Sequence, residues 1–430
     1  MYELINAVVR FLKKIVPKPV VHTLRKPYHA ALALLMAASY GFPARKLVVI
    51  GITGTKGKST AADMLFAILR ASGRKTALLS TIRFAIEDES EPNRFKMTLQ
   101  GRGFAQAFMR KALARGCTHI VIEVTSEAVM DYRHWFLAMD GLIVTNIQRE
   151  HIEHHGSFEN YVEAKRAIVR TLARSPKSNR ALVSNADIPE TKSFLSEPGI
   201  TRAVPFSMSN LSKVSSDDHS VRFSYCGISF SIPIPGTFNA MNALACVKMA
   251  ETLGVTVADS ARALVSLPVV RGRVERIDRG QPFTAIVDYA HTPDSLRALY
   301  AAFPQRKICV LGNTGGGRDT WKRPLMGQIA DEQCAEVILT NEDPYDEDPR
   351  AIVEAMAAGM KRKPRVVMDR REAIREALQL AQPGGAVLVT GKGTDPFIME
   401  ANGAKTPWSD AQVVSEELEK LAHQASMGAL

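Results

Sequence analysis

LVVIGITGTKGKST, residues 47–60, joins an apolar, β-branched run to a glycine-rich turn. Leu47–Ile50 has the composition of a strand that is buried on both faces. Ser59–Ser72 places Met64, Leu65, Ile68 and Leu69 at helical spacing. A glycine-rich loop between a strand and a helix is the context in which such loops hold phosphate. The stretch therefore predicts a nucleoside triphosphate site.

Each residue type in this loop has a chemical reason to be there. Gly54 and Gly57 lack a Cβ, so backbone N–H groups can turn toward a phosphate, and the helix that follows adds its positive end. Lys58 would neutralise phosphate charge and Ser59 would hold Mg²⁺. The standard pattern has glycine where this chain has Ile52, and a tight turn with a solvated lysine is the alternative. The expected nucleotide-binding residues are Gly54, Thr55, Lys56, Gly57, Lys58, Ser59 and Thr60.

Length and composition describe a soluble globular protein with two or three domains, since 430 residues exceed one ordinary core. Five scattered cysteines without a CxxC pair favour a reduced, cytoplasmic compartment. No apolar run reaches the roughly 18 residues of a membrane span. Residues 30–40 (AALALLMAASY) are expected to form a packed helix, and no export signal is predicted.

The net charge of +11 is concentrated at the N-terminus, where residues 1–46 contain eight Lys or Arg against one acidic residue, Glu3. Apolar residues from Leu4 to Ile15 recur at near-helical spacing among these basic residues. The pattern fits a helix packed on the protein with a solvated basic face, or peripheral contact with an anionic membrane. Nucleic-acid binding is not expected, because no basic motif is interleaved with aromatic residues.

The rest of the chain alternates strands and helices, which predicts an α/β fold with mostly parallel sheets. Residues 220–234 alternate in short runs around a Cys-Gly turn, as an antiparallel hairpin would. We expect a basic helical segment (1–46), a central ATP-binding domain with a mostly parallel sheet (47–270) and a C-terminal doubly wound, Rossmann-like domain (271–430). The expected strands are 118–125, 141–147, 181–185, 284–290, 307–312, 336–341, 365–368 and 386–391, and the expected helices are 103–115, 160–172, 239–253, 257–267, 294–302, 322–333, 349–361, 370–381 and 410–422.

Nine ordered motifs from residue 54 to residue 393 resemble those of the Mur ligases, and most closely the branch that adds the third residue to a muramoyl peptide. They are GTKGKST (54–60), EVTSEA (123–128), TNIQREHIEHHG (145–156), YVEAKRAI (161–168), GTFNAMNALA (236–245), DYAHTPDSL (288–296), RDTWKRPLMG (318–327), NEDPYDEDP (341–349) and GKG (391–393). The resemblance implies ATP-dependent activation of a carboxylate as an acyl phosphate, which an amine then attacks.

The resemblance also implies a metal site. Glu123 and His151 match the family's ligands, Ser59 adds a hydroxyl, and Lys165 matches a lysine that is carbamylated into a carboxylate-like ligand, with two Mg²⁺ ions. By residue type alone, a strand-end Glu is more often an ion-pair partner, a single His structural and a helical Lys solvated. Lys58, Lys165, His151 and Glu123 are the expected catalytic residues.

Further positions match the family's nucleotide contacts. Asn239 and Asn242 lie three apart on one helix face and match residues that flank the adenine, although Asn239 can also be an N-cap. Arg273, Asp288 and His291 resemble residues that meet the ribose and phosphates when the domains close, which would exclude water from an acyl phosphate.

The incoming amino acid is expected on the C-terminal domain, where Arg318 can hold a carboxylate with two hydrogen bonds. Diaminopimelate-using relatives usually carry Arg where this chain has Tyr345, and Glu where it has Asp395. The residues therefore leave the added amino acid undecided between meso-diaminopimelate, lysine and another diamino acid. The expected contacts are Arg318, Glu342, Asp343, Pro344, Tyr345, Gly391 and Asp395.

Thr98, Thr125 and Arg133 match positions that grip the muramoyl dipeptide, and Asp131 stands where glutamine is common. Relatives have about a hundred residues for the UDP portion before the phosphate loop, and here only some fifty precede it. Either the basic segment holds UDP, or the acceptor is a different or membrane-linked muramoyl peptide. A related folylpolyglutamate or polyamino-acid synthetase and an inactive nucleotide-binding regulator are the alternative functions. The oligomeric state stays open.

Overall fold

The apolar run before the glycine-rich loop forms an inner strand of an eight-stranded sheet in the computed structural model, which describes residues 18–95, 97–101, 103–150 and 152–428. This strand, β1 (Val48–Thr53), is longer than predicted and pairs in parallel with β5 (His119–Glu123) and β6 (Gly141–Val144). A Cβ on Gly51 would lie 2.6 Å from Met139 Sδ, so glycine is required for close packing there. The predicted buried strand is confirmed.

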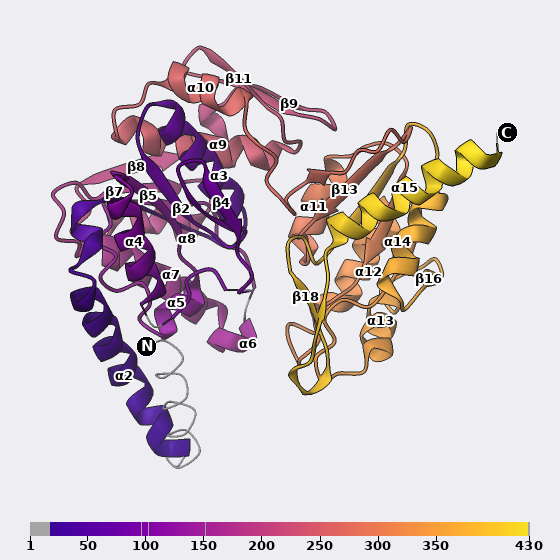
Figure 1. Ribbon diagram of the computed structural model, residues 1–430, viewed down its shortest axis with the longest axis horizontal. Coiled ribbons are helices and arrows are strands. Elements are labelled where there is room, and N and C mark those ends of the chain that lie inside the picture. The colour runs from indigo at the N-terminus through magenta and orange to yellow at the C-terminus, as the bar shows by residue number, and fades with distance from the viewer. Residues whose placement is uncertain (1–17, 96, 102, 151, 429–430) are drawn as a thin grey trace. The chain divides into compact units, whose positions relative to one another are not determined.

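Two groups of residues have most of their contacts within themselves (Figure 1). Unit 1 contains the described residues up to Arg149, together with His155–Leu211 and Met241–Leu264. Unit 2 contains Glu150–His154, Ser212–Ala240 and the residues from Val265 onward. Helices α6 (Ile152–His155) and α9 (Thr237–Thr252) contain residues of both units.

Unit 1 is built on the eight-stranded sheet, in the order β4-β3-β2-β5-β1-β6-β7-β8. The predicted parallel sheet is confirmed. The sequence analysis missed β2, β3 and β4 at one end of it, where the β2–β3 and β3–β4 pairings are antiparallel. β8 was also missed, and its Pro205 is tolerated because this strand lies at the other edge. The remaining strands are β2 (Thr76–Leu79), β3 (Arg83–Ile86), β4 (Glu89–Pro92), β7 (Ala181–Asn185) and β8 (Arg202–Phe206).

Helices cover both faces of this sheet, as the alternation of side chains along β1 shows. Val49 belongs to a buried cluster with Met109 of α4 and Ile168 of α7. Ile50 points the other way, toward the place where Met249 of α9 packs on Gly141. The helices are α3 (Lys58–Ala71), α4 (Phe104–Ala114), α5 (Ser126–Met130), α7 (Phe158–Ala173), α8 (Pro189–Ser193) and α10 (Val257–Val265).

Unit 2 contains the second predicted sheet, with strand order β12-β13-β17-β14-β15-β16, and all of its pairings but β12–β13 are parallel. Val310 and Val389 pack on one face with α14 and α15. The predicted hairpin at 220–234 is confirmed as β10–β11. The strands are β9 (Ser212–Ser216), β10 (Val221–Tyr225), β11 (Ile228–Ile232), β12 (Glu275–Arg276), β13 (Thr284–Asp288), β14 (Lys307–Leu311), β15 (Glu336–Leu339), β16 (Arg365–Val366), β17 (Ala386–Thr390), β18 (Phe397–Met399) and β19 (Lys405–Pro407), and the helices are α11 (Pro293–Ala301), α12 (Lys322–Gln333), α13 (Pro349–Ala357), α14 (Arg370–Gln379) and α15 (Asp410–Gly428).

The helix expected at residues 30–40 is part of α2 (Lys18–Ser39), but the expectation that it is packed is only half right. Ala37 is buried, whereas Leu34 and Leu35 are 48% and 65% exposed. Over the described residues, no helix is both long and apolar enough to cross a bilayer. The amphipathic run Leu4–Ile15 lies outside the described residues.

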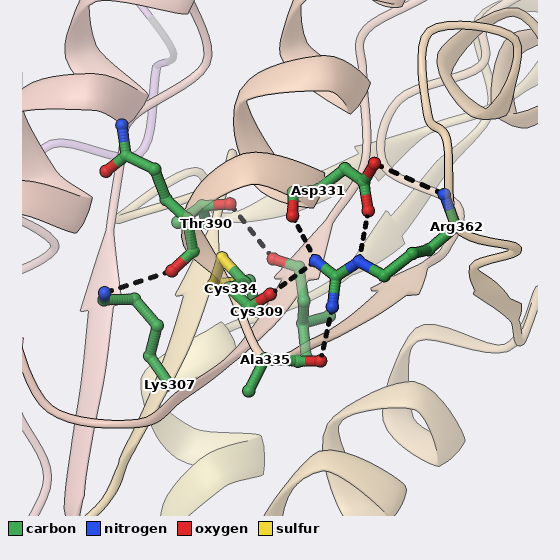
Figure 2. The surroundings of a disulfide bond; sticks show 9 residues. Lys307, Cys309, Asp331, Cys334, Ala335, Arg362 and Thr390 are labelled. Atoms are coloured by element: carbon green, nitrogen blue, oxygen red, sulfur yellow. Dashed lines mark hydrogen bonds and ion pairs between the residues drawn. A yellow bond between two sulfur atoms is a disulfide. The ribbon is translucent and has the colours of Figure 1, made fainter.

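A disulfide joins Cys309 in β14 to Cys334, just after α12 (Figure 2). The expectation of reduced cysteines is therefore wrong for this pair, whereas Cys117, Cys226 and Cys246 are free thiols. The partners are 25 residues apart in sequence, and they meet only because α12 packs on the sheet. Lys307 Nζ and Arg362 also donate to main-chain carbonyls at this end of α12.

The disulfide should stabilise unit 2, because a cross-link over a loop of this length removes about 3 kcal/mol of chain entropy from the unfolded state. We expect dithiothreitol to lower the melting temperature of the wild type by several degrees and to leave that of Cys309→Ala/Cys334→Ala unchanged. Cys226→Ser, at an exposed free thiol, is the matched control and should respond like the wild type. A wild-type melting temperature that is the same with and without dithiothreitol would contradict the presence of the disulfide.

Candidate active site

The glycine-rich loop is held by the residues that follow β6. Thr55 N–H donates to the Asn146 carbonyl at 3.0 Å, and Lys56 N–H donates to Asn146 Oδ1 at 2.9 Å. Thr145 Oγ1 donates to the Lys56 carbonyl at 2.7 Å. Gly54 has a φ of 146°, and a Cβ there would lie 2.0 Å from Thr145 Oγ1. The loop is therefore a tight cradle that only glycine can form.

The cradle opens onto the N-terminus of α3. Gly57 is the N-cap with a φ of 80°, and a Cβ there would lie 2.3 Å from Asn242 Oδ1. Ser59 and Thr60 are buried in the first turn. Lys58 Nζ donates to the Gly54 and Thr55 carbonyls, each at 2.9 Å, so its cation lies over the loop. A glycine-rich loop, a helix N-terminus and a lysine together suit a polyphosphate.

Lys165 reaches the same loop from α7. Its side chain is 2% exposed, and its Nζ donates to the Gly54 carbonyl at 3.0 Å and to Thr53 Oγ1 at 3.2 Å. One turn earlier on α7, the hydroxyl of buried Tyr161 lies 2.8 Å from Thr55 Oγ1. A solvated lysine is thus the wrong interpretation for Lys165, because α7 lays this face on the loop.

Glu123 ends β5 beside β1, in register with Ile52, and is fully buried. Its two oxygens accept from Thr81 N–H at 3.0 Å and from Thr81 Oγ1 at 2.8 Å. Thr81 Oγ1 also lies 2.6 Å from Thr98 Oγ1. A buried carboxylate whose hydrogen-bond donors are a neutral hydroxyl and an amide fits a place beside a divalent cation.

The described part of the chain contains no group of three His, Cys, Asp or Glu side chains arranged to hold a metal ion. His151 lies outside the described residues. Glu123 and Ser59 supply the hard oxygen donors that Mg²⁺ prefers, and they flank a loop suited to phosphate, whose oxygens commonly complete such a shell. The donor set therefore fits Mg²⁺ bound together with a nucleotide.

The expected acceptor residues lie near this carboxylate in unit 1. Thr98 is connected to Glu123 by hydrogen bonds through the Thr81 hydroxyl. Thr125 is the N-cap of α5, two residues after Glu123. The Arg133 guanidinium pairs with Asp131 and donates to the Leu99 carbonyl at 3.0 Å. Asp131, at the position where glutamine is common, thus partly neutralises Arg133.

Asn239 and Asn242 lie on α9, as predicted, but the N-cap alternative for Asn239 is wrong because the helix begins at Thr237. Asn239 Nδ2 donates to the Pro235 carbonyl at 2.8 Å. Asn239 groups with unit 2 and Asn242 with unit 1, where Asn242 contacts the loop at Gly57.

Unit 2 brings Arg273, Asp288 and His291 together around Tyr289. The Arg273 guanidinium lies 4.4 Å from the centre of the Tyr289 ring, and the His291 ring packs edge-on against it. Asp288 accepts from Val274 N–H and Ala290 N–H, each at 2.7 Å. The negative charge of Asp395, together with burial, raises the pKa of Tyr289 well above its ordinary value. The Tyr289 hydroxyl is therefore protonated at neutral pH.

A second cluster lies where β14, β15 and β17 end. Glu342 is 2% exposed; its Oε1 accepts from Thr314 Oγ1 at 2.9 Å, and its Oε2 has no hydrogen-bond partner among the described residues. Burial raises the pKa of Glu342 above its usual range. A Cβ on Gly391 would lie 2.0 Å from Glu342 Oε2, so glycine leaves room for this oxygen.

Asp343 is tied to Lys392, whose Nζ donates to its Oδ1 at 2.7 Å. Lys392 is fully buried, and its Nζ lies 3.7 Å from Asp395. The carboxylates of Asp343 and Asp395 therefore both lie close to this buried cation.

The Arg318 guanidinium lies 4.9 Å from the centre of the Tyr345 ring. Tyr345 has a φ of 53°, and its N–H donates to the Met399 carbonyl, so this turn is held by β18. Pro344 closes the other side, because its carbonyl would lie 2.2 Å from a Cβ on Gly315. The structure thus brings all seven predicted amino-acid contacts into one region of unit 2.

Four residues that support these clusters were missed by the sequence analysis. Asn146, Tyr161 and Lys392 each stand inside a quoted motif, which was a signal for them. Thr81 is an ordinary polar residue outside these motifs, and its partner Glu123 is distant in sequence. The four residues are Thr81, Asn146, Tyr161 and Lys392.

Tyr161→Phe should weaken ATP binding about fivefold, because it removes one neutral hydrogen bond of about 1 kcal/mol from Thr55. Calorimetric titration with ATP and Mg²⁺ measures this loss. Tyr40→Phe, outside the loop, is the matched control and should bind like the wild type. Equal affinities for Tyr161→Phe and the wild type would mean that the hydroxyl does not position the loop.

Comparisons with known proteins place this geometry in a family. Residues 52–250 match the Mur ligase middle domain, and residues 272–393 match the Mur ligase glutamate ligase domain. A UDP-N-acetylmuramyl-tripeptide synthetase from Roseiflexus sp. is 34% identical over 423 residues, with 91% of this chain and 82% of the relative covered. The UDP-N-acetylmuramoyl-L-alanyl-D-glutamate–2,6-diaminopimelate ligase of Chlorobium phaeobacteroides is 33% identical, with 93% and 82% covered.

Solved structures agree on the fold. A UDP-N-acetylmuramoyl-L-alanyl-D-glutamate–2,6-diaminopimelate ligase superposes with a TM-score of 0.60 at 25% identity, covering 88% of this chain and 79% of that one. The folylpolyglutamate synthase of Mycobacterium tuberculosis superposes with a TM-score of 0.68 at 20% identity, covering 87% and 95%. The motifs, both matched domains and the identity over most of the chain lead to one conclusion: this chain belongs to the Mur ligase family.

Proposed function

We propose that this Mur ligase adds a diamino acid, such as meso-diaminopimelate or lysine, to a UDP-N-acetylmuramoyl-L-alanyl-D-glutamate-type acceptor in peptidoglycan precursor synthesis. The observation that carries the proposal is the convergence of Lys58 and Lys165 on one glycine-rich loop, with Glu123 at the end of the strand paired to β1. The relatives named for this reaction share about a third of their residues with this chain.

ATP with two Mg²⁺ ions would supply the phosphoryl group that converts the acceptor carboxylate into an acyl phosphate. The loop N–H groups and Lys58 would hold the phosphates and offset their charge. Ser59, Glu123, His151 and carbamylated Lys165 would hold the metal ions. Arg273, Asp288 and His291, with Asn239 and Asn242, would bind the nucleoside.

Lys165 suits carbamylation because its amine is buried against carbonyl and hydroxyl oxygens. Carbamylation requires the neutral amine, whose nitrogen lone pair attacks CO₂; an N–C bond forms and one proton leaves to solvent. The product carries a negative charge where the free lysine carries a positive one, and that reversal is what a metal ligand needs.

The amino acid would bind in unit 2, with its α-carboxylate on Arg318. The unpartnered Glu342 Oε2 would accept a hydrogen bond from the distal ammonium group. Tyr345 offers no cation to a distal carboxylate, and Lys392 is already paired with Asp343. This arrangement supports a diamino acid and leaves the distal carboxylate of diaminopimelate without a bidentate partner.

Phosphate release should require ATP, a muramoyl dipeptide acceptor and a diamino acid together. Lys58→Ala should lower kcat at least a hundredfold, because it removes a charge that faces the transferred phosphoryl group. Lys363→Ala, at an exposed surface position, is the control and should keep wild-type turnover. Activity with folate and glutamate instead would favour the polyglutamate alternative, and ATP binding without turnover on any pair would favour the regulator.

Carbamylation should give a carbamate carbon signal in the NMR spectrum of the enzyme in ¹³C-bicarbonate. The signal should disappear in Lys165→Gln and persist in Lys177→Gln, at a lysine outside the loop. A spectrum without a carbamate signal in the wild type would contradict the modification.

A cytoplasmic location, peripheral membrane contact through residues 1–46 and the absence of nucleic-acid binding stay predictions from the sequence.

A further inference from the structure

From Tyr28 to Ala38, helix α2 presents to water a face that contains no charged residue. Tyr28, Leu34 and Leu35 are 41%, 48% and 65% exposed, and Ala31 and Ala38 are also exposed. Positions 28, 31, 35 and 38 follow helical spacing, so they line one face, with Leu34 beside it. From Pro27 to Ala44 the sequence contains no Asp, Glu, Lys or Arg.

The opposite face of α2 is the one that packs on unit 1. Ala37 is buried, and Met36 packs so closely on Gly103 that a Cβ there would lie 2.4 Å from its Cε. His29 Nε2 lies 3.5 Å from Asp131 Oδ1. Figure 1 shows α2 extending away from the sheet of unit 1. The exposed apolar face is therefore additional to the face that anchors the helix.

Such a face is unusual, because a helix with one side on the protein and one side in water normally carries charge on the water side. An exposed apolar surface typically marks a site that another surface covers.

The charges that flank this face are positive on both sides. No acidic residue occurs between Glu3 and Asp63. The basic residues of this stretch outside the phosphate loop are Arg10, Lys13, Lys14, Lys18, Arg25, Lys26, Arg45 and Lys46. An uncharged helix face between clusters of lysine and arginine is complementary to the interface of an anionic bilayer. No described helix can span the bilayer, so the helix would lie in the plane of the interface.

We propose that the exposed face of α2, formed by Tyr28, Ala31, Leu34, Leu35 and Ala38, docks this enzyme onto an anionic lipid bilayer. Arg45 and Lys46, which are exposed just beyond the C-terminal end of α2, contact lipid headgroups, and Leu34 and Leu35 enter the acyl boundary.

Docking would bring the expected acceptor residues close to the membrane, because α2 contacts them directly. His29 meets Asp131, which pairs with Arg133. Met97, whose sulfur lies 3.1 Å from the Arg133 guanidinium, and Trp135 are 42% and 39% exposed in the same part of unit 1. Tryptophan is favoured at the boundary between lipid and water.

Co-sedimentation of the full chain with vesicles tests this docking. We expect binding to phosphatidylglycerol/phosphatidylcholine vesicles at low salt, weaker binding at high salt, and none to pure phosphatidylcholine. Leu34→Glu/Leu35→Glu should lower the affinity at least tenfold, since it removes two apolar side chains from the face and adds two negative charges. Val366→Glu, at an exposed apolar residue of unit 2, is the matched control and should bind like the wild type.

Three outcomes would overturn the proposal. Wild-type protein that stays in the supernatant shows that lipid does not cover this face. A double variant that sediments like the wild type assigns binding to the basic residues alone. A wild-type dimer that becomes monomeric in the double variant assigns the face to a second copy. Melting temperatures of both variants confirm folding, and because sedimentation needs no turnover, its failure leaves the ligase proposal standing.

Discussion

The hydrogen bonds that tie the glycine-rich loop to Thr145 and Asn146 are the constraint on which the rest of the catalytic region depends. They hold the main chain so close that Gly54 must lack a side chain, and they place Gly57 at the start of α3. Because two neighbouring parallel strands, β1 and β6, supply both sides of this tie, the sheet itself sets the position of the phosphate cradle. Glu123, at the end of the neighbouring strand β5, is then placed beside the cradle by strand pairing alone.

Helix α7 makes a second set of hydrogen bonds to the glycine-rich loop, through Tyr161 and Lys165. Lys165 and Tyr161 are four residues apart, so one helical face delivers an amine and a hydroxyl to adjacent loop residues. A lysine held in this way is almost fully buried, and its amine donates to oxygen atoms of the β1 end and the loop. The same packing that orders the loop therefore prepares this amine for the chemistry that we propose for it.

Unit 2 contains a cluster of charged side chains that are buried, among them Glu342, Asp343 and Lys392. Asp343 is neutralised by Lys392, whereas one buried oxygen of Glu342 has no hydrogen-bond partner among the described residues. An unpartnered buried oxygen is costly, and it is retained most readily where a ligand can supply the missing donor. Tyr345 packs against Arg318 in the same cluster, and its phenol supplies no positive charge.

Local patterns in the sequence determined the fold class, the phosphate loop and most strands and helices, because apolar periodicity and glycine spacing report on neighbouring residues. In the eight-stranded sheet they missed β2, β3, β4 and β8, which are strands of only four or five residues. Only the tertiary structure decided which side chains meet across long separations: Tyr161 with Thr55, Thr81 with Glu123, and Cys309 with Cys334. The exposure of α2 belongs to the same class. Periodicity shows that a helix has an apolar face, but whether the protein covers that face depends on packing between distant segments.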